Sequence, residues 1–226
     1  MRIALGVCAA IAGLALLPSS GGAQTAPPLR HLEVSGGYGA ATGAALGQQD
    51  ANLRTATAGT PFRLFTTTSR MSAAPMLDLR AGIALTRRYG VEGHASYGHP
   101  EVRTSISSDA EGAPDVTAVE RLDEYLIDAG VVVRFDEWTF AGVSPFATVG
   151  GGYLRQLHED LIAIEEGGVF FVGGGVKRAF VVRPHGWWRA LGVRGDARLN
   201  VLSGGITIDD RTRRHVAVSV SLYIVF

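Results

Sequence analysis

The stretch that decides the fold is the carboxyl-terminal segment 215–226, which reads HVAVSVSLYIVF. Apolar residues occupy every second position, and small or polar residues lie between them. A period of two predicts a β-strand with one apolar face and one polar face. The apolar face consists of Val216, Val218, Val220, Leu222, Ile224 and Phe226.

The same alternation recurs throughout the chain and predicts eight strands of about ten to thirteen residues. It is clearest in segments 76–86, 124–135, 190–201 and 216–226, and glycine weakens it in segments 29–38, 91–101, 145–157 and 169–180. No sustained 3.6-residue period appears, and no apolar run after Gln24 is long enough for a transmembrane helix. The sequence therefore predicts an all-β protein, an eight-stranded antiparallel up-and-down barrel.

The connections between the predicted strands are asymmetric. Those at 87–90, 136–144 and 181–189 are short and lie on one side, whereas 39–75 and 102–123, on the other side, are long and rich in Thr, Ser, Ala and acidic residues. Short turns on one side and long polar loops on the other are typical of outer-membrane barrels, and we expect 39–75 and 102–123 to be such loops.

Aromatic residues gather at both ends of the predicted strands. Such belts suit two membrane–water interfaces. The short-turn end has Tyr89, Phe135, Trp138, Phe140, Phe180, Trp187, Trp188 and Phe226, and the other end has Tyr38, Tyr97, Tyr125, Tyr153, Phe170 and Phe171.

The amino-terminal residues 1–23 have the layout of a secretory signal peptide. Arg2 is followed by an uncharged apolar stretch, and Gly21 and Ala23 place small residues before a cut at Gln24. We expect an exported barrel domain over residues 24–226, which would lack the single cysteine, Cys8. The balance of 21 basic against 21 acidic residues argues against a nucleic-acid partner.

The predicted inward face is charged. An eight-stranded barrel is filled by its own side chains, and ionised groups in a narrow lumen must pair with one another. We therefore predict a charge network that plugs a closed lumen, with an ion or proton path through His94 as the alternative. The predicted network is Asp78, Arg80, Glu92, Glu124, Asp128, Arg134, Lys177, Arg194, Asp196 and Arg198.

Glu92, His94 and Ser96 share one strand face and raise the alternative of a lipid-modifying outer-membrane enzyme. On the predicted register they point inward, away from lipid. The sequence has no Gly-x-Ser-x-Gly, no His-Glu-x-x-His and no cysteine after residue 23. We therefore predict no catalytic residue, no metal site and no cofactor.

Several stretches carry a resemblance to a known family: LEVSGGY at 32–38, YGVEG at 89–93, PFATVGGGY at 145–153 and the closing strand. They resemble the small outer-membrane β-barrels of Gram-negative bacteria, of the OmpA and OmpX kind. The resemblance implies a membrane-embedded barrel with a structural, adhesive or surface-interaction role.

The resemblance further implies that Val216, Val218, Val220, Leu222, Ile224 and Phe226 form an assembly signal read by the barrel-assembly machinery. We expect the other partners to be outer-membrane lipid and lipopolysaccharide, and the chain to be a monomer. A second alternative stays open: an exported soluble barrel of the lipocalin kind, because period two does not say which face points outward.

Overall fold

The computed structural model describes residues 31–53, 61–158, 163–206 and 211–226. The predicted signal peptide, 1–23, lies outside the described residues. Within them, no helix is long and apolar enough to cross a membrane.

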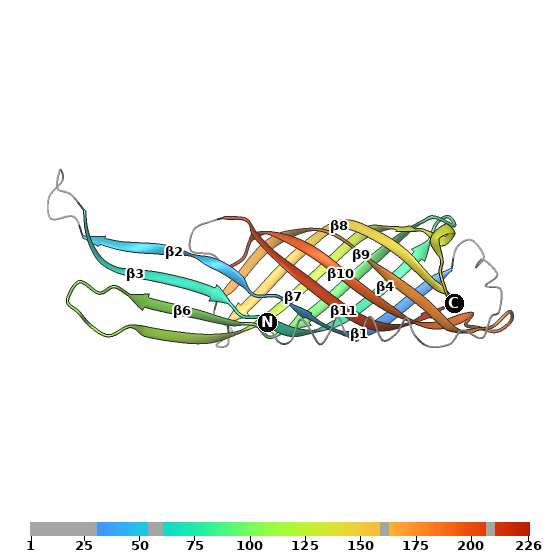
Figure 1. The fold of residues 1–226 in the computed structure, drawn as a ribbon, viewed down its shortest axis with the longest axis horizontal. Helices are drawn as coiled ribbons and strands as arrows, with labels where there is room; N and C mark the ends of the chain where they lie inside the picture. The colour runs from blue at the N-terminus through green and yellow to red at the C-terminus, as the bar shows by residue number, and fades with distance from the viewer. Residues whose placement is uncertain (1–30, 54–60, 159–162, 207–210) are drawn as a thin grey trace.

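Eight antiparallel strands close into a barrel, as the sequence predicts (Figure 1). β1 pairs with β4 on one side and with β11 on the other, so the two ends of the chain close the sheet. The barrel strands are β1 (Leu32–Ala41), β4 (Ala74–Ala84), β5 (Tyr89–Gly98), β7 (Val116–Arg134), β8 (Val143–His158), β9 (Ile164–Val182), β10 (Ala190–Gly204) and β11 (Arg213–Val225).

The short connections meet at one end of the barrel, near the carboxyl terminus. The turn between β7 and β8 contains a single 3₁₀ turn, η1 (Asp136–Trp138), in which the rings of Phe135 and Trp138 stack with centroids 5.1 Å apart. Trp187, in the turn between β9 and β10, lies 5.5 Å from the ring of the terminal Phe226. Aromatic residues therefore gather at this rim, which we call the turn end.

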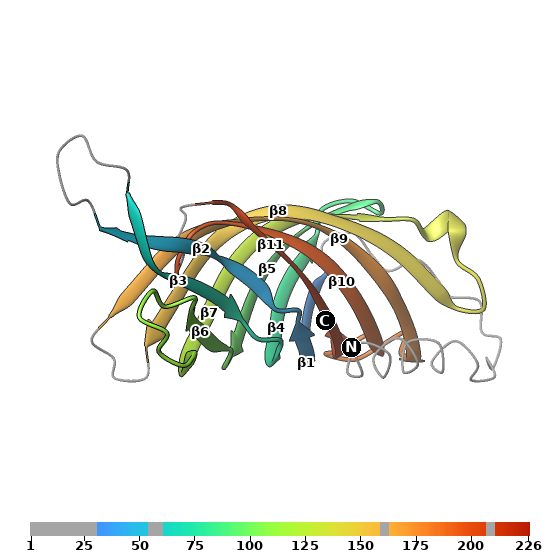
Figure 2. The same ribbon diagram turned by 60° about the vertical axis from the view of Figure 1, so that its left-hand side comes forward.

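The expectation of long loops at 39–75 and 102–123 is wrong. These segments hold β2 (Ala44–Leu53), β3 (Phe62–Met71), β6 (Glu101–Ser107) and the first residues of β7. Together they form a four-stranded sheet in the order β2-β3-β6-β7, which projects from the end opposite the turns (Figures 1 and 2). We call this sheet the extension.

Polar side chains on both faces explain why the sequence pattern missed the extension. An apolar–polar alternation appears only when one face of a sheet is buried or meets lipid. In the extension, hydroxyl groups lie on both faces: Ser69 bonds to Thr104 at 2.7 Å, and Thr66 donates to Asp50 at 2.7 Å. The strands are stabilised by ladder pairing and cross-strand polar pairs instead.

The register places the apolar face of the barrel outside. Leu79, Ile127 and Leu222 are 62%, 62% and 58% exposed, whereas Asp78 and Arg194 are fully buried in the lumen. A soluble ligand-binding barrel needs the reverse arrangement, so the lipocalin-like alternative is wrong for this fold. One belt residue also differs from the expectation: Phe171 points into the lumen and is 1% exposed.

Inward glycines on β7, β8 and β9 leave room for two aromatic rings. A Cβ atom added at Gly150 would lie 2.7 Å from Cζ of Phe171, and one at Gly175 would lie 2.8 Å from Cζ of Phe146. Real Cβ atoms do not approach so closely, so glycine is required where the rings cross the strands. The glycine runs 150–152 and 173–175 thus contribute to close packing of the lumen.

Gly150→Ala is expected to destabilise the barrel by about 1–3 kcal/mol, because the new methyl group overpacks the lumen against Phe171 and the Ala129 carbonyl. Urea unfolding, followed by the gel mobility of unheated samples, measures the change. Gly168→Ala is the matched control on β9, since its added Cβ would have no neighbour within 4 Å. Equal midpoints for the two variants would contradict the packing account.

Candidate functional site

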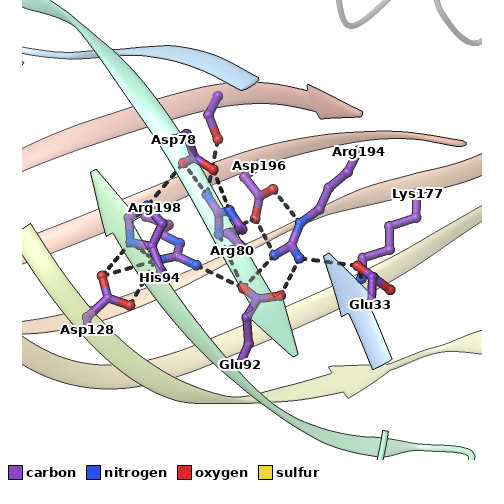
Figure 3. A network of polar contacts seen from close by, with 11 residues as sticks. Glu33, Asp78, Arg80, Glu92, His94, Asp128, Lys177, Arg194, Asp196 and Arg198 are labelled. Carbon is purple, nitrogen blue, oxygen red and sulfur yellow. Dashed lines mark hydrogen bonds and ion pairs between the residues drawn. The ribbon is translucent and has the colours of Figure 1, made fainter. Parts of the chain in front are cut away.

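The candidate site is a buried network of charged side chains that crosses the lumen (Figure 3). The strands β1, β4, β5, β7, β9 and β10 each contribute at least one of its members. Alternation along each strand sends every second side chain inward, so residues distant in sequence meet at the same level of the barrel. The members are Glu33, Asp78, Arg80, Glu92, His94, Asp128, Lys177, Arg194, Asp196 and Arg198.

Arg194, on β10, is the centre of the network. Its guanidinium makes a forked pair with Asp196, through Nε at 2.6 Å and Nη2 at 3.0 Å. The opposite edge makes a second forked pair with Glu92, through Nη1 and through Nη2 at 3.0 Å. A planar guanidinium can serve two carboxylates in this way, whereas a lysine ammonium has no such fork.

Arg80, on β4, links this centre to the neighbouring wall. It holds Asp78 in a forked pair, with both N–O distances at 2.7 Å, and donates to the hydroxyl of Ser219 at 3.1 Å. Its Nη1 lies 3.3 Å from Glu92 and 3.4 Å from Asp196. Asp196 therefore accepts from two arginines, Arg80 and Arg194, and Glu92 accepts from these two and from Arg198.

His94 lies between two carboxylates at the edge of the network. Its Nδ1 is 2.6 Å from Asp128, and its Nε2 is 3.1 Å from Asp78. Arg198 shares the Asp128 carboxylate at 3.3 Å and reaches Glu92 at 3.2 Å. Nη1 of Arg198 also lies 3.1 Å from Nδ1 of His94, so the imidazole contacts two carboxylates and one arginine.

The network holds five carboxylates and, besides His94, four basic side chains. The carboxylates belong to Glu33, Asp78, Glu92, Asp128 and Asp196, and the basic side chains are Arg80, Lys177, Arg194 and Arg198. Buried charges are tolerated only when they pair and keep their hydrogen bonds. Among these side chains, Nε of Arg198 is buried without a hydrogen-bond partner.

Two phenyl rings support the arginines from the side. The guanidinium of Arg194 lies 4.5 Å from the ring centroid of Phe146, and that of Arg198 lies 4.5 Å from the centroid of Phe171. These are the rings for which Gly175 and Gly150 leave space. Cation–π contacts of this kind strengthen when they are shielded from water.

The structure joins eight of the ten predicted charged residues and places the other two apart. Glu124 accepts from Gln156 at 2.6 Å, nearer the extension, while Arg134 donates to the Thr86 carbonyl at 2.9 Å at the turn end. The predicted set omitted Glu33, which bonds to Lys177 at 2.5 Å and connects it to Arg194. The sequence carries a signal for this residue, because the apolar Leu32 and Val34 on either side of Glu33 indicate that Glu33 lies on the inward face.

Apolar side chains close the lumen between the network and the extension. Leu126, Leu154, Val169 and Leu202 form one buried cluster on the inward face. A second cluster, where the extension joins the barrel, is formed by Leu46, Met71, Val102 and Leu122. Strand patterning had assigned this inward face to polar groups. Along the inward face of β7, the charged network is thus followed by two apolar clusters, with the Glu124–Gln156 pair between them.

The described contacts of His94 are to charged side chains. Its Nδ1 contacts Asp128 and Arg198, its Nε2 contacts Asp78, and among the described hydrogen bonds none joins it to Ser96. The side chains of Glu92 and His94 are buried inside the barrel, away from lipid. Within the described part of the chain, no group of three or more His, Cys, Asp and Glu residues is placed to hold a metal ion.

A closed antiparallel barrel with an apolar exterior and a charged interior is the architecture of the small eight-stranded outer-membrane proteins. Among solved structures, the chain is similar to the outer membrane protein OprG from Pseudomonas aeruginosa, with a TM-score of 0.54 and 11% identity over 88% of this chain and 96% of that one. Ail, the attachment invasion locus protein of Yersinia pestis, aligns with a TM-score of 0.41 and 13% identity over 87% of this chain and 99% of that one. No family model and no curated protein sequence matches the chain.

Arg194→Met is expected to destabilise the barrel by about 3–5 kcal/mol, because it leaves Glu92 and Asp196 without their main partner. Urea unfolding in detergent micelles measures the change. Adding Glu92→Gln to the variant should restore part of the loss, since one unpaired carboxylate is then neutral.

Arg88→Met is the matched control. Arg88 pairs with Glu137 at 2.7 Å in the solvent-exposed turn end, with side chains 55% and 77% exposed. Loss of such a pair costs less than about 1 kcal/mol. Equal effects at Arg194 and Arg88 would show that the lumen network does not stabilise the fold.

Proposed function

We propose that this chain is an integral outer-membrane β-barrel that presents the extension at the cell surface and catalyses no reaction. In this proposal, residues 1–23 direct export and residues 24–226 form the barrel domain. The lumen network fixes the shape of the barrel and blocks it. The role at the surface is structural or adhesive and is carried by the extension.

The observation that carries the proposal is the apolar exterior. A belt of exposed Leu, Ile and Val side chains surrounds the barrel, and aromatic residues flank it at both ends. Trp187 and Phe140 are 76% and 84% exposed at the turn end, and Tyr38 is 72% exposed toward the extension. A continuous apolar surface of this extent is unfavourable in water and favourable in lipid.

Closure of the sheet supports the same proposal. In the hydrocarbon core of a membrane, an unpaired backbone group costs several kcal/mol, so spanning sheets must have no free edge. Here β1 pairs with β11 over residues Glu33 to Ala41, and each barrel strand has two neighbours. A soluble sheet needs no such complete pairing.

The extension supports a role in surface interaction. Its face continues the outer wall of the barrel and carries a cross-strand row of polar side chains, Gln48, Thr68, Ser105 and Thr117, at neighbouring positions of the four strands. Strand pairing holds this row at regular spacing, so polar contacts to a partner need little further ordering. Among the described residues, the connections at the opposite end of the barrel are short turns.

A labelling experiment tests membrane insertion and orientation together. The chain beyond residue 23 has no cysteine, so Thr68→Cys on the extension and Arg87→Cys at the turn end introduce single thiols. We expect both variants in the membrane pellet, with Thr68→Cys labelled by an impermeant maleimide on intact cells and Arg87→Cys labelled only after lysis.

Protein that stays soluble without detergent would overturn the membrane proposal. Labelling of Arg87→Cys but not Thr68→Cys on intact cells would invert the orientation and place the extension in the periplasm.

The second part of the proposal concerns assembly. The outward side chains of β11, Val216, Val218, Val220, Leu222 and Ile224, with Phe226 beyond them, are proposed to be read by the barrel-assembly machinery. The terminal residue has a place in the structure as well, since the Phe226 N–H donates to the Leu32 carbonyl at 2.8 Å. Stability and assembly must therefore be measured separately.

Deletion of Phe226 is expected to leave the chain unassembled in the periplasm, while Phe226→Tyr inserts normally because the terminal aromatic group is kept. Membrane fractionation and heat-modifiable gel mobility measure assembly. Refolding of the purified deletion variant in detergent separates the two roles, and we expect it to succeed. Normal insertion of the deletion variant in cells would refute the assembly signal.

A further inference from the structure

The outer face of the barrel continues without a break onto the extension. On β7, the side chains of Tyr125 and Ile127 face outward, and Arg121 and Val119 follow on the same face at the same spacing of two. Val119 is the register partner of Arg103 on β6, and Arg103 is the partner of Arg70 on β3. Three arginines therefore share the outward face of the extension.

These arginines lie just beyond the aromatic belt. The rings of Tyr97 and Tyr125 are 4.7 Å apart and mark the boundary of the apolar exterior. Arg121 is four residues past Tyr125, which is about 13 Å along a strand at about 3.3 Å per residue. Tyrosine belts sit at the headgroup level, so the tilted strand carries Arg121 to the height of the phosphate and sugar groups.

The arginines carry more positive charge than their surroundings neutralise. Glu101 lies 3.1 Å from Arg103 and 3.9 Å from Arg121, and the side chains of Arg103 and Arg121 are 55% and 72% exposed. Within the described residues, no carboxylate lies within ion-pair distance of Arg70. Arg70 and Arg103 are direct cross-strand partners, an arrangement of like charges that destabilises a sheet unless an anion is shared.

The nearby acids are otherwise engaged. Asp123, also on this face, pairs with His99 at 2.7 Å and accepts from Tyr97 at 3.2 Å. Glu120 pairs with His158 on the opposite face of β7. Among the described residues, Glu101 is thus the one carboxylate that pairs with any of these three guanidinium groups, each of which has the fork that matches a phosphate.

We propose that Arg70, Arg103 and Arg121 bind the phosphate group of a phosphorylated glycolipid in the outer leaflet. We assign the phosphate to a lipid because the arginines and the apolar exterior of the barrel lie on one continuous face. The acyl chains of a lipid whose phosphate contacts these arginines would lie against the apolar belt on the barrel side of Tyr97 and Tyr125. This inference rests on the proposed function, because it needs the barrel to be inserted with the extension outside. It adds a defined lipid site to that function.

The test compares lipid binding by the purified full chain in detergent micelles, using native mass spectrometry. The probes are bisphosphorylated lipid A and its fully dephosphorylated form. We expect the triple variant Arg70→Gln, Arg103→Gln, Arg121→Gln to bind the phosphorylated probe at least about tenfold more weakly, since each basic group near an anionic lipid contributes about fivefold. The wild-type chain should prefer the phosphorylated probe to a similar degree.

The matched control is a second triple variant, Arg87→Gln, Arg88→Gln, Arg183→Gln, which removes three exposed charges at the turn end. It should bind the phosphorylated probe as the wild type does. Equal weakening in both triple variants, or equal binding of the two lipids by wild type, would overturn the site.

Inorganic phosphate is added as a competitor to separate a lipid site from a general anion site. We expect less than a twofold loss of lipid binding, and complete competition would overturn the lipid assignment. Heat-modifiable mobility of each sample reports barrel formation independently. Well-folded, membrane-inserted variants with unchanged lipid binding would refute this inference alone, whereas a chain that never inserts would refute the proposed function.

Discussion

The closure of β1 against β11 is the constraint on which the other features depend. Lipid offers no hydrogen bonds to a free strand edge, so a membrane sheet must pair its first strand with its last. Once the sheet is closed, each strand has a single inward and a single outward face. Eight strands leave a lumen only wide enough for side chains. Successive residues of each strand therefore point outward and inward in turn, and the inward ones must fill the lumen.

Charge in the lumen follows from this geometry. The planar guanidinium of Arg194 pairs with two carboxylates. Arg80 and Arg198 form further ion pairs, with Glu92 and Asp128, that join other strands of the barrel to this centre. Burying these ions costs free energy that the pairing offsets. A slip of one residue on β10 would send Arg194 and Asp196 into lipid. The network thus selects one register among those that the apolar exterior alone would allow.

The extension differs from the barrel because polar side chains lie on both of its faces. Beyond the rim, the strands need neither an apolar nor a charged face, and Ser, Thr and Gln appear on both. Its outward arginines are placed by the barrel, since the faces of β7 do not change between Ile127 and Val119. The single long strand β7 therefore joins the outward face of the barrel to the outward face of the extension.

The period-two pattern of the sequence by itself determined the eight barrel strands, the side of the short turns and the inward face of Arg194, Asp196 and Arg198, because lipid on one side imposes a strict alternation. It did not reveal β2, β3 and β6, where no such contrast exists. Which charges meet was decided by the tertiary structure: Glu33 reaches Lys177 from β1, while Glu124 and Arg134 are separated from the network by their height in the lumen. The alternation of apolar and polar residues shows only whether a side chain points into the lumen or outward. Height and partner depend on strand stagger, which is set by the pairing of whole strands.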